Sequence, residues 1–121
     1  TPGWALLLGL VTGVICAFAI ELKWKLGYDD SLDVVGIHLV GGVVGTLYLG
    51  FFATETGLFL GGGFEQLVVQ FVIALVAVIF TAVMTLIIAF IVKPLGWRVS
   101  KEDEDTGIDE TEHAETAYEL A

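Results

Sequence analysis

The chain has 121 residues, of which 56% are hydrophobic and 17% are charged, and its formal net charge is −10. The high apolar fraction excludes a disordered chain, and a single cysteine, Cys16, excludes a domain held by internal disulfides. The excess of acidic over basic residues argues against nucleic-acid binding. Residues 98–121 carry −7 of the net charge. Residues 1–97 are therefore predicted to be a transmembrane region, and residues 98–121 an acidic aqueous tail.

Three long apolar stretches cover residues 4–22, 34–53 and 67–92. A bilayer core of roughly 30 Å is crossed by about 20 helical residues, which matches the first two stretches. The third would form a helix of about 39 Å, so we expect it to be tilted or to extend beyond the membrane. Packed into a soluble domain, such helices would have almost no polar face. The pattern predicts an all-α membrane protein with three transmembrane helices.

The first stretch contains Gly9 and Gly13 at the spacing that lets helix backbones approach closely in lipid. It lacks a basic leading segment, and a second span follows closely, so it does not read as a signal peptide. The chain begins with Thr1 and Pro2 rather than with Met. This start is compatible with a processed protein or with a piece of a longer one.

Two aspartates precede the second stretch. Asp30 is a good N-cap, and Asp33 lies three residues later, near the positive end of the helix dipole. For Asp33, a purely local structural role and a functional role both remain open. Farther along, the glycines of residues 61–63 mark an external turn before the third stretch, and Pro94 is predicted to stop the third helix.

His38 lies a few residues inside the second stretch, where ionisable groups are costly and are usually functional. A neutral imidazole can donate a hydrogen bond with one nitrogen and accept one with the other. These properties suit a polar pathway, a proton relay or a small hydrogen-bonding substrate. The alternative is a histidine that bonds to a neighbouring helix for structure only.

Glycines follow His38 at helical spacing. Gly42 and Gly45 share a helical face with the histidine, and Gly41 and Gly45 form a second close-packing pair. We interpret these glycines as helix-packing residues. Close packing on that face would place His38 toward protein rather than toward lipid.

The basic residues near the spans predict the orientation. Lys23 and Lys25 follow the first span, residues 54–66 contain no Lys or Arg, and Lys93, Arg98 and Lys101 follow the third span. Because short cytoplasmic loops carry the excess of Lys and Arg, the N-terminus of this chain is predicted outside and the tail in the cytoplasm.

The tail holds two kinds of segment. Residues 102–105 form an acidic run that is typical of a solvated segment, whereas Gly107, Asp109, His113 and Tyr118 belong to a more mixed stretch. We expect this stretch to be an ordered docking segment, the alternative being a dispensable solvated tail. No second metal-type ligand has suitable spacing with His113, so neither a metal nor a cofactor is predicted.

Two segments of the sequence resemble those of a known protein family. Residues 28–45 read YDDSLDVVGIHLVGGVVG, and residues 107–119 read GIDETEHAETAYE. Together they resemble the ammonium transporter (Amt/Mep/Rh) family, specifically its last three membrane helices and cytoplasmic C-terminus. Two positions depart from the family pattern: Leu39 stands where members often have glycine, and so does Ala114.

The resemblance implies an eleven-helix fold with an inverted repeat, a homotrimer with one pore per subunit, and multi-pass insertion in the cell membrane. Two histidines meet in each pore, and His38 matches the one from the second repeat. Asp33 matches an aspartate that supports local structure before the histidine helix. The implied activity is recruitment of ammonium, its deprotonation, and passage of ammonia past the histidines, which is transport and not enzymatic catalysis.

The resemblance also implies that this chain is the C-terminal portion of a transporter and does not conduct alone. The tail would couple subunits and meet a PII-type signalling protein at the cytoplasmic face. Two other readings stay open. The first is a complete three-span accessory membrane protein, and the second is a Rh-like gas channel or an ammonium sensor.

Overall fold

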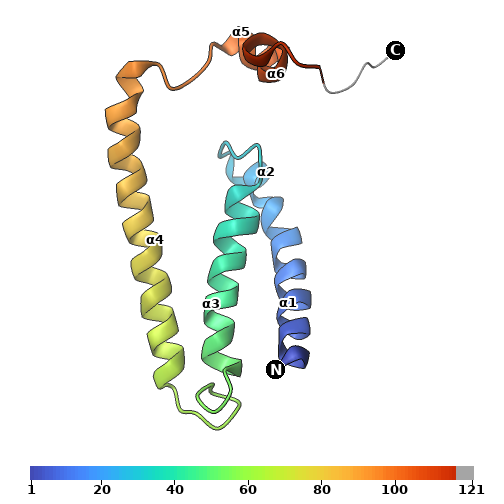
Figure 1. Cartoon of the computed structure of the whole chain (residues 1–121), viewed down its shortest axis with the longest axis vertical. Helices are drawn as coiled ribbons and strands as arrows, with labels where there is room; N and C mark the ends of the chain where they lie inside the picture. Colours follow the sequence, from blue (N-terminus) through green and yellow to red (C-terminus); the bar gives the residue numbers. More distant parts are fainter. Residues whose placement is uncertain (117–121) are drawn as a thin grey trace. The chain divides into compact units, whose positions relative to one another are not determined.

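The structure is a computed structural model, and it describes residues 1–116. Within that range every regular element is a helix (Figure 1). The elements are α1 (Pro2–Ile20), α2 (Leu22–Leu26), a π-helix η1 (Val35–Leu39), α3 (Val40–Phe52), α4 (Glu65–Val92), a 3₁₀ turn η2 (Lys93–Leu95), α5 (Lys101–Thr106) and α6 (Ile108–His113).

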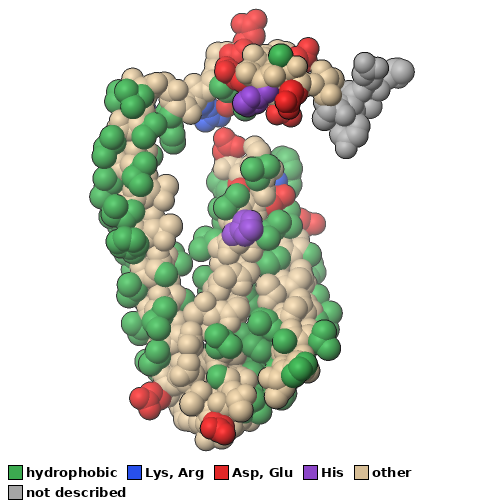
Figure 2. Space-filling view, in the orientation of Figure 1, with side chains coloured by type: hydrophobic (Ala, Val, Ile, Leu, Met, Phe, Trp, Pro, Cys, Tyr) green, Lys and Arg blue, Asp and Glu red, His purple; other side chains and the backbone are tan. Residues whose placement is uncertain are grey.

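Among residues 1–116, three helical segments are long and apolar enough to cross a membrane: Pro2–Leu26, Val35–Phe52 and Glu65–Leu95. The most apolar 18 residues of the third segment have a mean hydropathy of 3.0, and none of them is buried within the chain. Figure 2 shows hydrophobic side chains along the length of α4. Apolar surface of this extent is stable only against lipid or other protein. The predicted fold class, an all-α membrane protein, is confirmed.

The chain divides into two units, residues 1–79 and 80–121. In the first unit, α1 packs against both η1 and α3, and the two segments run side by side in opposite directions (Figure 1). α1 begins at Pro2, because proline has the fixed φ of a helix and its missing N–H would be unpaired there anyway. α2 ends at Gly27, which adopts the left-handed conformation (φ +71°) that glycine tolerates.

The loop between α3 and α4 folds back on the end of α3. The Leu58 N–H donates to the Gly50 carbonyl, and the Phe59 N–H donates to the Phe51 carbonyl, each at 3.0 Å. These bonds satisfy two of the carbonyls that every helix end leaves without a partner. A Cβ at Gly50 would lie 2.7 Å from the Leu67 Cα atom, so this glycine lets the start of α4 approach α3 closely.

In the second unit, α4 ends at Val92 as the sequence predicts, and Pro94 lies in the 3₁₀ turn that follows. Residues 102–105, which were predicted to be a solvated run, are mostly exposed and lie in helix α5. Ser100 begins this helix, because its hydroxyl oxygen accepts a hydrogen bond from the Asp103 N–H. The acidic residues of the first turn also lie at the positive end of the helix dipole.

Candidate functional site

Asp30 caps the helical segment that carries His38. One of its carboxylate oxygens accepts from the Val34 N–H and the other from the Val35 N–H, both at 2.8 Å. These backbone donors begin the helix and have no partner within it. The side chain predicted to cap the second span therefore does so.

Asp33 has a different role. It has a positive φ of +56°, which is uncommon for a residue other than glycine, although aspartate tolerates it better than most residues. Its carboxylate accepts a hydrogen bond from the Lys23 ammonium at 2.5 Å. The same ammonium donates to the Asp30 backbone carbonyl at 3.1 Å. The two aspartates are therefore joined through one lysine from the preceding helix.

His38 lies in η1, the π-helical turn that begins directly after these aspartates. The Val40 N–H donates to the Val35 carbonyl, five residues back, which defines the wider turn. Single π-helical turns occur frequently at functional sites. The sequence predicts an ordinary α-helix here, because hydrophobic periodicity does not distinguish hydrogen bonds that span four residues from those that span five.

One face of this helical segment contacts α1. A Cβ at Gly36 would lie 2.9 Å from the Ile20 Cα atom, and a Cβ at Gly41 would lie 3.3 Å from the Cys16 sulfur. The Cys16 thiol also donates to the Ile37 carbonyl at 3.7 Å. Small residues thus bring the two helices together, as proposed for membrane helix contacts. Gly41 was predicted from the sequence as a packing residue, whereas Gly36 was not.

The other face is open within the chain. His38 and Gly42 are exposed, and a Cβ at Gly42 or Gly45 would meet nothing within 4 Å. Across residues 1–116, no hydrogen bond or ion pair to His38 is present. Gly9 and Gly13 of α1 are similarly open. Within this chain, Gly41 therefore makes a helix contact, whereas Gly42 and Gly45 lie on the same uncovered side as the histidine.

The predicted tail residues lie in and around α6. Gly107 precedes the helix with φ +114°, a conformation that other residues rarely adopt. Asp109 is in its first turn and His113 is its last residue. Figure 2 shows acidic side chains gathered on the two short tail helices. Tyr118 lies outside the described residues.

An aromatic cluster that the sequence analysis did not predict joins α1, α3 and the following loop. The Tyr48 hydroxyl donates to the Trp4 carbonyl at 2.8 Å, and the Tyr48 side chain is 8% exposed. The Phe52 ring stacks on both Tyr48 and Trp4, with ring centroids 4.5 and 4.7 Å away. Trp4 thus helps to hold the N-terminal end of α1 against the C-terminal end of α3.

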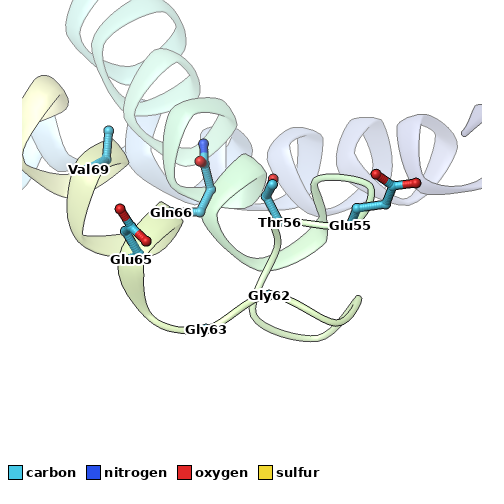
Figure 3. Close-up of a pocket in the computed structure, with 7 residues that line it drawn as sticks. All are labelled: Glu55, Thr56, Gly62, Gly63, Glu65, Gln66 and Val69. Carbon is cyan, nitrogen blue, oxygen red and sulfur yellow. The ribbon is translucent and has the colours of Figure 1, made fainter.

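A pocket of about 340 Å³ lies beside this loop (Figure 3). Glu55 and Glu65 extend at opposite sides of it in this view, with Thr56 and Gln66 between them (Figure 3). In residues 1–116, no three His, Cys, Asp or Glu side chains are grouped as metal ligands. The pocket is an open depression at the start of α4, lined by both polar and apolar surface.

Comparison with known proteins gives consistent results along the chain. The model of the Ammonium Transporter Family matches residues 1–118. An ammonium transporter of Mycobacterium tuberculosis is 49% identical over 97% of this chain and 27% of its own length. A putative ammonium transporter of Methanothermobacter thermautotrophicus is 41% identical, and an ammonium transporter of Bacillus subtilis is 36% identical. Each alignment covers 98% of this chain and 31% of the relative.

The chain thus spans less than a third of the length of the curated relatives it matches. No solved structure matches the chain. The family match covers the three long helices, the capped turn with His38 and the two tail helices together. The chain belongs to the ammonium transporter family.

Proposed function

We propose that this chain supplies the last three membrane helices and the cytoplasmic tail of an ammonium transporter, in which His38 lines the path of ammonia. The observation that carries the proposal is the open face of η1 and α3. His38 is exposed there and a Cβ at Gly42 or Gly45 would meet nothing within 4 Å, whereas Gly36 and Gly41 contact α1.

An uncovered histidine in a membrane helix is costly unless it meets other protein or a polar pathway. In a transporter with further helices, the lack of side chains at Gly42 and Gly45 leaves room for another helix to pack beside the imidazole. A second histidine from an earlier helix would complete the pathway. A neutral imidazole offers both a donor and an acceptor to a passing ammonia molecule.

We also propose how the chain is oriented in the membrane and how the subunits assemble. The N-terminus of this chain is outside, the loop between α3 and α4 is external, and α5 and α6 are cytoplasmic, in agreement with the positions of Lys and Arg. Three subunits assemble, and the tail segment with Gly107, Asp109, His113 and Tyr118 couples them and meets a PII-type protein.

Reconstitution separates this proposal from that of a complete three-span accessory protein. The complete gene product that contains residues 1–121 is placed in liposomes, and residues 1–121 alone are placed in a parallel set. We expect ammonium-driven internal pH change and methylammonium uptake only with the complete product. Equal flux through residues 1–121 alone would contradict the proposal, and so would an inactive complete product that is folded and inserted.

A further inference from the structure

Lys23 is unusually shielded for a lysine at the end of a membrane helix. Its side chain is 14% exposed, whereas lysines in this position commonly extend toward water. The ammonium lies 5.2 Å from the centroid of the Trp24 ring, within the range of a cation–π contact. The side chain is thus directed back toward the protein rather than into solvent.

Both hydrogen-bond acceptors of Lys23 belong to the short connector before the helix that carries His38. They are the Asp33 carboxylate at 2.5 Å and the Asp30 backbone carbonyl at 3.1 Å. The Asp30 side chain in turn binds the first two free N–H groups of that helix. Lys23 is therefore linked to the start of this helix through Asp33 and Asp30.

The register in which this segment packs against α1 determines where His38 points. Successive residues of an α-helix are rotated by about 100°, so a slip of the segment by one residue against α1 would turn the imidazole off the open face by about that angle. The contact between Gly36 and α1 is steric, since a Cβ there would meet the Ile20 backbone at 2.9 Å. A steric contact limits the distance between helices but does not by itself select a hydrogen-bonding register.

We propose that Lys23 is a positioning residue for His38: through Asp33 and Asp30 it fixes the start of the π-helix and so keeps the imidazole on the open face. The functional part of this inference rests on the proposed transport role of His38. The positional part depends only on the connection from Lys23 to the helix start.

The test uses the complete transporter in liposomes with three variants. Lys23→Met keeps the side-chain length and removes the donors, and Lys23→Arg keeps the charge and the donors. Lys25→Met is the matched control, because Lys25 is an exposed lysine of the same short helix. Maximal flux and the apparent KM are measured at equal amounts of inserted protein.

We expect Lys23→Met to lower maximal flux by roughly 10- to 100-fold with little change in KM, the scale on which a misplaced reacting group is costly. Lys23→Arg should recover most of the flux. Lys25→Met should stay within about twofold of wild type, because exposed charges contribute little. Wild-type flux in Lys23→Met, or equal losses in Lys23→Met and Lys25→Met, would overturn the proposal.

A second readout reports the position of the imidazole directly. In solid-state NMR with isotope-labelled histidine, the His38 signals are assigned by their loss in His38→Ala. We expect these signals to shift in Lys23→Met and to match wild type in Lys25→Met. Unshifted His38 signals in Lys23→Met would overturn the positioning role, whatever the flux. If Lys23→Met does not insert, Asp33→Asn is compared in the same way, since it removes the anionic partner of the lysine.

The two readouts keep the inference separate from the proposed function. If His38→Ala transports like wild type, the proposed role of His38 fails, and shifted His38 signals in Lys23→Met still support positioning. If His38→Ala abolishes flux while the signals in Lys23→Met stay unshifted, the transport role stands and the positioning role fails.

Discussion

At Gly36, a single hydrogen atom in place of a side chain permits the contact between the start of the second span and the end of α1. The nearest atoms to a Cβ placed there belong to the Ile20 backbone and not to the end of a movable side chain. Backbone of a packed helix moves only with the helix itself. Even the smallest side chain at this position must therefore push the two helices apart.

We accordingly expect Gly36→Ala to destabilise the folded transporter by about 1–3 kcal/mol, the usual cost of adding a methyl group to a filled site. The measurement is the thermal unfolding temperature of the complete protein in detergent. Gly3→Ala is the control, because Gly3 is exposed and a Cβ there meets nothing within 4 Å of this chain. An unfolding temperature for Gly36→Ala equal to that of the control would contradict the close approach.

Individual residues differed in how well the sequence predicted them. The cap at Asp30 was predictable because it depends on residues only four and five positions later. The pairing of Asp33 with Lys23 was not, because it requires the chain to fold back between two helices. Gly41, Gly42 and Gly45 were found by their spacing from His38, whereas Gly36 was not, and spacing alone did not tell that Gly41 is the one of the three that contacts α1.

Among the elements, the long helices were predicted well and the short ones poorly. A helix such as α4 is defined by 28 residues of apolar composition, so its limits are visible in the sequence. The π-helical turn of η1 and the short tail helices depend on single caps and backbone angles. α5 and α6 are separated by one residue, Gly107, whose backbone lies in a region that favours glycine.

The junction of α5 and α6 at Gly107 gives a testable prediction for the tail. Gly107→Asp should lower flux by about fivefold or more, because forcing another residue into a rare backbone region costs of order 1–3 kcal/mol and would disturb the junction of α5 and α6. Flux is measured in liposomes at equal protein amounts. Glu102→Gln is the control, since it changes one exposed acidic residue in the same tail without altering backbone preference. Equal flux in both variants would support a dispensable tail.

Ala114 illustrates a departure from the family pattern with a structural consequence. It ends α6 in the left-handed conformation, with φ +52°, at a position where the resemblance leads one to expect glycine. A side chain in this region carries a small steric cost that glycine avoids. The end of α6 in this chain is therefore less favourable than the same turn formed with glycine.

For the whole molecule, the family and the membrane class follow from features spread along the chain, namely three apolar helices and a match over residues 1–118. These features can be recognised from the sequence of this chain alone. The proposed ammonia pathway could not be predicted in the same way, because the face with His38 is open within residues 1–116. Under the proposed function, its neighbours come from transporter helices outside this chain.

The most direct test of the account is ammonium flux through the complete transporter carrying His38→Ala, measured in liposomes by the internal pH change and by methylammonium uptake. Lys25→Met is carried alongside, and the amount of folded, inserted protein is equalised for each variant. The account predicts that His38→Ala loses nearly all flux or changes its mode, while the control stays near wild type. Unchanged flux and unchanged mode in His38→Ala would contradict the assignment of His38 to the ammonia pathway.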